Sequence, residues 1–247
     1  MARLSRHELK EDEFVSTVEA AEEFARQHVN EIVAGVLAAL IVVAAVVGWN
    51  MYSSRQESAA NAALGQALKT YQAGVGPAPA TNLFNPDAST PPPGAPEFTS
   101  DQQKYQAALK QFTEVVAKYP RQAAADFARY HIGLCQAELG NDTGAVRTLQ
   151  AASNSGDKNV AALASEALAG ELDKTGKTDE AIKIYQRLAD HPTSTVPRAA
   201  ALLAEASLYR NTKPAQARAL YEQVQKEFGS DPYLTQQVQQ QMAGLPK

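Results

Sequence analysis

The sequence predicts an all-α protein in which one transmembrane helix precedes an α-solenoid of about four helix pairs plus a capping helix. Three observations lead to this fold class: a long uncharged apolar run near the N-terminus, a cluster of prolines between two helical regions, and a recurrence of about 36 residues in the second half. The helix-favouring residues Ala, Gln, Leu and Glu are frequent throughout the chain.

Charge is unevenly distributed along the chain. Residues 1–31 carry four basic and eight acidic side chains, and we interpret them as an acidic tail, whose cytosolic location is implied by the family resemblance given below. Residues 55–247 hold 19 basic and 19 acidic side chains, without a stretch rich in Lys or Arg. Nucleic-acid binding needs basic groups that neutralise phosphates. The sequence therefore predicts that nucleic acid is not a partner, and the repeats described below predict protein partners.

Residues 32–54 are the predicted transmembrane anchor. They contain no charged side chain, and the run as far as Trp49 is almost wholly apolar, which meets the ~20 residues needed to cross a hydrocarbon core. Trp49 and Tyr52 follow where aromatic side chains meet a membrane interface. A buried core helix would carry a polar stripe, and a signal peptide usually has an apolar region of only ~7–15 residues. We therefore expect a retained anchor.

The anchor also contains small residues at four-residue spacing. Such a pattern lets a second transmembrane helix approach closely. The residues predicted to pack in this way are Gly35, Ala39, Ala44 and Gly48. The flanks of the span carry too few Lys and Arg side chains for the positive-inside rule to give its direction.

Prolines dominate residues 74–99, which are predicted to form a Pro-rich flexible loop. Seven prolines lie between Gly74 and Pro96, and no helix or strand tolerates that many. A loop of this length is uncommon inside a compact domain, so either the domain begins after it or it interrupts a repeat. Residues 55–73 are helical in pattern, with Ala60, Leu64, Ala67 and Tyr71 on one face. We expect this helix to pair with the helix that begins near Ser100.

Residues 100–247 are the predicted repeat domain. A triplet of residues recurs four times in it. Each triplet has a small residue, a large residue four positions later and an apolar residue three positions after that. The triplets are Ala108, Phe112 and Val115; Ala145, Leu149 and Ala152; Ala181, Tyr185 and Leu188; and Ala217, Tyr221 and Val224. Each triplet occupies one helix face, and the spacing of 36 or 37 residues is typical of stacked two-helix repeats. Neither helix buries that face alone, so neighbouring units complete the core.

These triplets resemble the second helix of the tetratricopeptide repeat. That helix reads Ala, three residues, an aromatic, two residues, Ala, four residues, Pro, and Ala108, Phe112, Val115 and Pro120 reproduce the spacing with Val for the second Ala. Pro192 comes one residue early and Pro232 three residues late, so the match is to a divergent repeat. Pro232 also opens a Gln-rich last helix that suits a solvent-facing cap.

The resemblance implies a concave partner-binding surface made by the first helix of each pair. By register with the repeat, this surface is expected to carry Phe127, Tyr130, Leu134, Glu166, Leu202, Tyr209 and Arg210. Some such domains clamp a peptide C-terminal carboxylate with a set of basic and Asn side chains, but these positions hold one basic residue, Arg210, and no Asn. Binding of chaperone C-terminal tails is therefore not expected.

Nothing in the sequence indicates catalysis. The four histidines are scattered, and no metalloprotease, nucleophile-elbow or phosphate-binding motif occurs. The single cysteine, Cys135, forms neither an intramolecular disulfide nor a cysteine-rich metal site. We predict no catalytic, cofactor-binding or metal-binding residues, and no enzyme activity.

The order of parts, with an acidic tail, one anchor and divergent repeats, resembles the YfgM-like family of ancillary Sec translocon subunits. The resemblance implies a bacterial inner-membrane protein with a cytoplasmic N-terminus and a periplasmic repeat domain that links exported polypeptides to periplasmic chaperones. An alternative is a repeat adaptor for cell-envelope assembly in outer-membrane or division complexes, although those usually lack such an anchor. A third possibility places the repeats in the cytoplasm.

Overall fold

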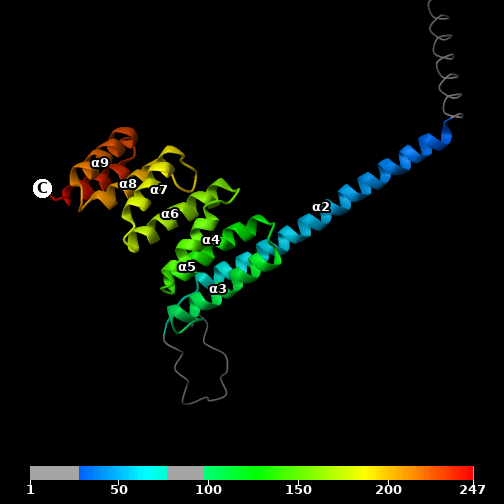
Figure 1. Cartoon of the computed structure of the whole chain (residues 1–247), viewed down its shortest axis with the longest axis horizontal. Helices are drawn as coiled ribbons and strands as arrows, with labels where there is room; N and C mark the ends of the chain where they lie inside the picture. Colours follow the sequence, from blue (N-terminus) through cyan, green and yellow to red (C-terminus); the bar gives the residue numbers. More distant parts are fainter. Residues whose placement is uncertain (1–27, 77–96, 247) are drawn as a thin grey trace, which may run out of the picture. The chain divides into compact units, whose positions relative to one another are not determined.

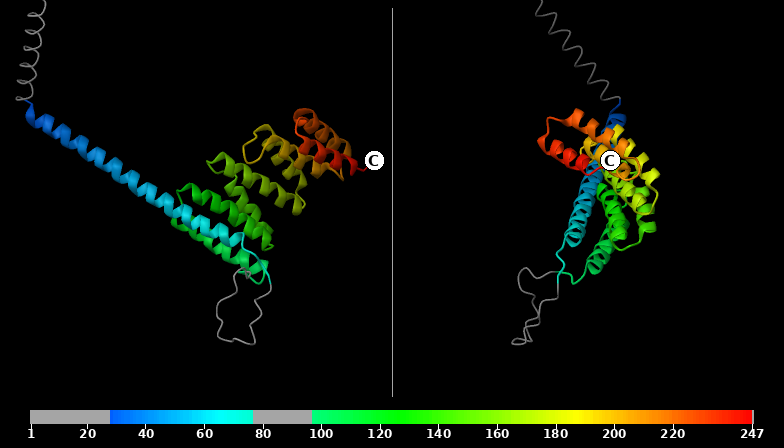
Figure 2. Two further views of the ribbon diagram at one scale, coloured as in Figure 1. Left: turned by 180° about the vertical axis from the view of Figure 1, so that it is seen from behind. Right: turned by 90° about the vertical axis from the view of Figure 1, so that its left-hand side faces the viewer.

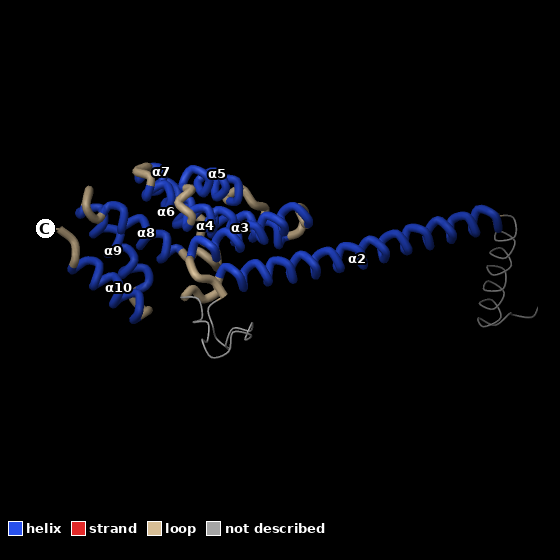
Figure 3. The backbone as a smooth tube through the Cα atoms, turned by 90° about the horizontal axis from the view of Figure 1, so that it is seen from below, coloured by secondary structure: helices blue, strands red, loops and turns tan. Residues whose placement is uncertain are grey.

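The computed structural model describes residues 28–76 and 97–246 (Figure 1). Most of the predicted tail and of the predicted Pro-rich loop therefore lies outside the described residues. Within them the structure contains helices and loops and no strand beyond one isolated bridge (Figure 3). The predicted all-α class, with a long apolar helix followed by a solenoid of paired helices, is confirmed.

The described helices follow one another through short connections, apart from the proline-rich segment between the first two. They are α2 (Val29–Tyr71), α3 (Asp101–Lys118), α4 (Ala123–Glu138), α5 (Asp142–Ala152), α6 (Lys158–Lys174), α7 (Thr178–Asp190), α8 (Arg198–Tyr209), α9 (Pro214–Phe228) and α10 (Pro232–Ala243). The chain divides into two compact units, one ending at Arg55 and the other beginning at Gln56. Helix α2 is continuous through this boundary.

The part of α2 in the first unit is long and apolar enough to cross a membrane. Its most apolar window has a mean hydropathy of 2.7, and none of that window is buried inside the protein. Ile41 is 69% exposed and Trp49 is 71% exposed. An ideal Cβ built on Gly35 or Gly48 would meet no atom within 4 Å. The predicted packing surface of Gly35, Ala39, Ala44 and Gly48 is thus open along the described helix.

In the second unit, the C-terminal part of α2 packs against α3 and α4. Ala60 and Ala67 are fully buried in the same apolar cluster as Phe112 of α3. The Tyr71 ring lies 5.5 Å, centroid to centroid, from the ring of Tyr105. Beyond α2, the backbone N–H of Gly76 donates to the carbonyl of Phe98 at 3.1 Å. The two ends of the proline-rich segment are therefore hydrogen-bonded to each other.

Three further helix pairs, α4–α5, α6–α7 and α8–α9, stack in sequence and α10 follows them (Figure 2). Gly140 and Gly176 form the turns within the first two of these pairs with φ of 75° and 82°, a backbone conformation that favours glycine. The repeated small residues Ala108, Ala145, Ala181 and Ala217 are all fully buried. The small side chain at this position lets the two helices of each pair approach closely, as the periodicity predicted.

Candidate partner-binding surface

The first helices of the pairs place their side chains in a common register. Gly133 of α4, Ala169 of α6 and Ala206 of α8 are buried and lie 36 and 37 residues apart. A Cβ on Gly133 would come within 2.6 Å of the buried Leu149 side chain, so this position is where the first helix meets the second. The residues three positions before these small residues are equivalent to one another, and they are Tyr130, Glu166 and Leu203. By the same alignment of the helices, Phe127 of α4 is equivalent to Ala200 of α8, and Leu134 is equivalent to Ser207.

Helix α4 contributes an aromatic patch to this surface. Phe127 and Tyr130 are partly exposed, and their ring centroids lie 5.9 Å apart. His131 is only 7% exposed, and its ring lies 4.8 Å from that of Phe127 and stacks 4.9 Å from that of Phe112. Its Nδ1 lies 3.0 Å from the carbonyl oxygen of Phe127. The buried His131 imidazole therefore packs against the inner side of this aromatic patch. Leu134, about one turn further along α4, is partly buried.

The buried imidazole makes the stability of this region depend on pH. Burial lowers the pKa of His131, and the Phe127 carbonyl opposes this only in part. The unfolded chain, with an ordinary histidine pKa near 6.5, then binds more protons than the folded chain below that pH. We expect the thermal midpoint to fall as the pH drops from 7.5 to 5.5, and to fall less in His131→Leu. The exposed His191→Leu variant should behave like the wild type.

Glu166 of α6 carries a half-buried carboxyl group. Burial raises its pKa. Its charge in turn adds to the effect of burial in raising the pKa of Tyr130 and of Tyr185. Among the described residues no Lys, Arg or His forms an ion pair with Glu166. This surface therefore presents a poorly solvated carboxyl without a cation.

Removing that carboxyl should stabilise the protein at neutral pH. A raised pKa in the folded state means that the carboxyl's contribution is favourable when protonated and is lost as the pH rises through the folded pKa. Glu166→Gln should therefore have a higher thermal midpoint than the wild type at pH 7.5, and the difference should shrink toward pH 4. The exposed Glu180→Gln variant is the matched control and should show no such pH-dependent gain. Equal behaviour of the two variants would contradict the placement of Glu166.

Helix α8 differs from the sequence-based expectation by one residue. Leu202 is 4% exposed and belongs to the apolar core, whereas its neighbour Leu203 takes the position equivalent to Tyr130 and Glu166. The signal that finds Leu203 is the spacing of the buried small residues on the first helices. The side chain of Leu202 therefore packs inside the domain, and Leu203 belongs to the surface.

The two remaining predicted residues lie at the C-terminal end of α8. The Lys213 ammonium group lies 5.5 Å from the centroid of the partly exposed Tyr209 ring. Arg210 donates from Nη1 to Gln241 Oε1 at 3.2 Å and from Nη2 to the Gly244 carbonyl at 3.3 Å. Arg210 thus links α8 to the end of α10, and its guanidinium is engaged within the protein.

No group of three or more His, Cys, Asp or Glu side chains among the described residues could hold a metal ion. Cys135 is buried, and burial raises the pKa of its thiol to about 12. A thiol with so high a pKa is protonated at neutral pH and is a poor nucleophile.

A comparison with known protein families matches residues 22–246 to a model described as a tetratricopeptide repeat-like domain. The match covers the apolar helix as well as all the repeats. No curated protein and no solved structure matches the chain.

Proposed function

The chain belongs to the tetratricopeptide repeat-like domain family, and from this premise we propose that it is a membrane-anchored scaffold that binds partner polypeptides on the surface formed by α4, α6 and α8. Domains of this kind are typically non-catalytic protein-interaction modules. The apolar part of α2 supplies an anchor of sufficient length. The repeats supply the binding surface.

One observation supports this function above the others. The row of equivalent positions on the first helices carries partly exposed aromatic and aliphatic side chains together with a carboxyl group that lacks a cation. Aromatic side chains are enriched where proteins bind one another. A surface of this composition is suited to a polypeptide segment that supplies apolar and basic side chains.

We further propose that the anchor lies in a bacterial inner membrane with the repeats in the periplasm. There the scaffold stands near the Sec translocon and links exported polypeptides to a periplasmic chaperone. Support comes from the order of parts, in which an apolar helix near the N-terminus leads directly into the repeats. Protease added to spheroplasts tests the orientation. The repeats should be degraded from outside, and their protection would place them in the cytoplasm.

Photo-crosslinking in native membranes tests the partners. A photoreactive amino acid at Phe127 on the binding surface should capture a translocon subunit or periplasmic chaperone. The same group at the exposed Arg147 of α5 provides the control and should capture far less of either. Recovery of outer-membrane assembly or division proteins from Phe127 would favour the envelope-adaptor function. Equal yields of the same proteins from both positions would contradict a binding role for this surface.

A further inference from the structure

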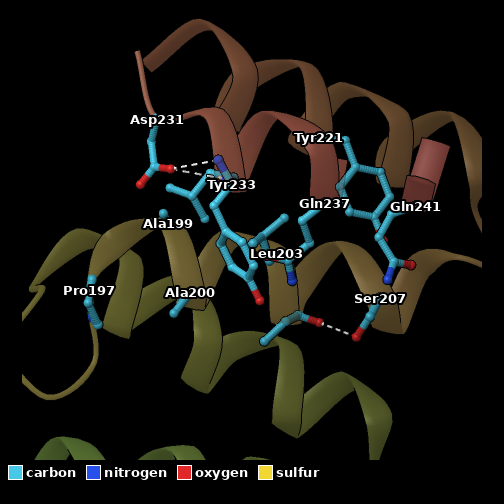
Figure 4. A pocket seen from close by; sticks show the side chains of 12 residues that line it. Pro197, Ala199, Ala200, Leu203, Ser207, Tyr221, Asp231, Tyr233, Gln237 and Gln241 are labelled. Carbon is cyan, nitrogen blue, oxygen red and sulfur yellow. Dashed lines mark hydrogen bonds between the residues drawn. The ribbon is translucent and has the colours of Figure 1, made fainter. Parts of the chain in front are cut away.

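A cleft of about 530 Å³ lies between α8 and α10 (Figure 4). Its volume falls in the range of about 300–1,000 Å³ that is usual for sites that bind small molecules. Apolar side chains of both helices form most of its walls, and three of those on α8 are alanines. They are Ala199, Ala200, Leu203 and Ala204 of α8 and Leu234 of α10. The cleft is therefore suited to a slender apolar chain.

Tyr221 of α9 reaches the same cleft and carries an unsatisfied polar atom. It is 1% exposed, and its hydroxyl oxygen is buried without a hydrogen-bond partner among the described residues. Burying a hydroxyl group without a partner is costly, so native proteins nearly always supply one. Figure 4 shows Gln241 and Ser207 at this end of the cleft. An oxygen of a ligand at this end would provide the acceptor that Tyr221 lacks.

A positive charge lies next to the same end of the cleft. Gln241 lines the cleft, and its Oε1 accepts a hydrogen bond from Arg210 Nη1 at 3.2 Å. Arg210 Nη2 donates to the Gly244 carbonyl at 3.3 Å, and no Asp or Glu among the described residues forms an ion pair with Arg210. A guanidinium has five N–H donors, so two neutral acceptors leave its positive charge uncompensated. Burial raises the pKa of Tyr221, and this charge opposes the rise.

The acidic residue of the lining, Asp231, lies at the other end of the cleft. Figure 4 shows it away from Tyr221 and Gln241. Its Oδ1 accepts hydrogen bonds from the backbone N–H groups of Tyr233 and Leu234 at 2.9 and 3.2 Å, so the carboxylate caps the start of α10. An anionic group at the Tyr221 end of the cleft therefore meets the Arg210 charge without a carboxylate beside it.

The walls of the cleft favour an aliphatic chain over a peptide backbone. Each peptide unit brings an N–H and a C=O group that need partners when they are buried. The polar groups of the lining are in part already used, because the Ser207 hydroxyl donates to the Ala204 carbonyl at 2.7 Å and Asp231 caps α10. An aliphatic chain brings no polar group, and its burial against the alanines is favourable.

We propose that this cleft binds a small carboxylic acid with an unbranched apolar chain, which lies between α8 and α10. The carboxylate takes the place of the Gln241 amide on Arg210 and accepts a hydrogen bond from the Tyr221 hydroxyl. Hydrogen bonds between charged groups are roughly twice as strong as neutral ones, so a carboxylate is a better partner for the guanidinium than an amide. This ligand site goes beyond the proposed scaffold function and does not depend on it.

Titration of the full-length protein in an uncharged amphipathic polymer with three ligands of equal chain length tests the proposal. Octanoate carries the carboxylate, octanamide is its neutral analogue, and octylamine is a cation. Isothermal titration calorimetry, with the polymer alone as background, should show saturable binding of octanoate and about tenfold weaker binding of octanamide. Octylamine should show no saturable binding. The absence of saturable octanoate binding, or equal affinities for octanoate and octanamide, would overturn the proposal.

Gln241→Glu tests the contact with Arg210. The new carboxylate pairs with the guanidinium inside the protein, so the affinity for octanoate should fall about tenfold, while that for octanamide should change much less. Gln240→Glu adds the same charge at an exposed position of the same helix and should leave both affinities unchanged. An unchanged octanoate affinity in Gln241→Glu, or an equal loss in the two variants, would contradict the contact.

Tyr221→Phe tests the contact with the hydroxyl group. The variant should bind octanoate about fivefold to tenfold more weakly, as expected for one lost hydrogen bond, without a lower thermal midpoint. Tyr119→Phe, at the end of α3, makes the same chemical change elsewhere and should leave binding unchanged. If Tyr221→Phe lowers the thermal midpoint and leaves octanoate binding intact, the hydroxyl is structural and the proposal fails.

A second copy of the chain and a partner polypeptide are the competing occupants. Leu203→Asp places a charge on the wall of the cleft and should abolish octanoate binding without changing the sedimentation coefficient. A shift from dimer to monomer in Leu203→Asp, with no octanoate binding by the wild type, would assign the cleft to self-association. Tighter binding of a Gly-Ser peptide that ends in phenylalanine would assign it to a polypeptide and overturn the proposal. Crosslinks from Phe127 test the scaffold function separately, so either proposal can fail alone.

Discussion

Replacing Phe112 with alanine is expected to lower the free energy of unfolding by about 3–5 kcal/mol, the usual cost of removing a fully buried aromatic side chain. Phe112 is 0% exposed and lies in the apolar cluster to which α2, α3 and α4 all contribute. Its ring centroid lies 6.3 Å from that of Tyr71 in α2 and 4.9 Å from that of His131 in α4. One side chain of α3 therefore joins the first helix pair to the second.

We expect the helix pairs next to Phe112 to unfold in the variant before the rest of the repeat domain does. In a repeat protein each unit contacts only its neighbours, so stability is roughly a sum of repeat and interface contributions. Urea denaturation of full-length Phe112→Ala in detergent, followed by circular dichroism, should show an early transition from the first two pairs. Phe127→Ala removes the same kind of side chain from a partly exposed position and should cost less than half as much. Equal losses in the two variants would contradict the role assigned to Phe112.

The second helices were predictable because packing constrains them tightly. Where two helices cross closely, only a small residue fits, and the next turn must fill the remaining space with a large side chain. The same arrangement occurs in α5, with Ala145 and Leu149, and in α9, with Ala217 and Tyr221. All four side chains are at most 1% exposed. Such a constraint leaves a periodic signal that can be read without the structure.

For α8, the first helix of its pair, the exposed face was harder to predict. Its start contains Ala199, Ala200, Ala201, Leu202, Leu203 and Ala204 without an intervening polar residue, so no side chain marks the exposed face. Rotation by one residue, or about 100°, exchanges Leu202 for Leu203 on the surface. The structure resolves the register because Leu202 is buried against the core.

The cleft could not be predicted from sequence at all. The Gln-rich face of α10 was expected to face solvent, and Gln236, Gln239 and Gln240 are exposed, but Gln237 lines the cleft between α8 and α10. Tyr221 occupies an ordinary repeat position and resembles any core aromatic in the sequence. Its missing hydrogen bond depends on how α8, α9 and α10 come together in space.

The junction between the predicted anchor and the predicted pairing helix shows a different kind of limit. The change in composition after Ser54 suggested two segments, but no Gly or Pro interrupts the chain there. A helix continues where nothing breaks it, and α2 runs unbroken from Val29 to Tyr71. The apolar helix and the first repeat helix are therefore one element.

Cutting the chain within residues 77–96 tests what holds the first pair together. A protease site inserted in this segment should be cleaved without releasing the repeats from membranes. The fragment that begins near residue 97 should remain with the membrane fraction after centrifugation. Ala60, Ala67 and Tyr71 of α2 pack into the same cluster as α3 and α4, so the contacts that hold the two fragments together are noncovalent.

A charge in this interface should release the cleaved fragment. Ala67 is fully buried, so Ala67→Glu buries a carboxylate without a partner, which is far more costly than one loop closure. The exposed Ala59→Glu is the matched control on the same helix, and its cleaved fragment should stay bound. Release of the wild-type fragment would mean that the covalent link, and not packing, retains the repeats. Retention in wild type and Ala59→Glu but not in Ala67→Glu would identify α2 as the first helix of the solenoid as well as its anchor.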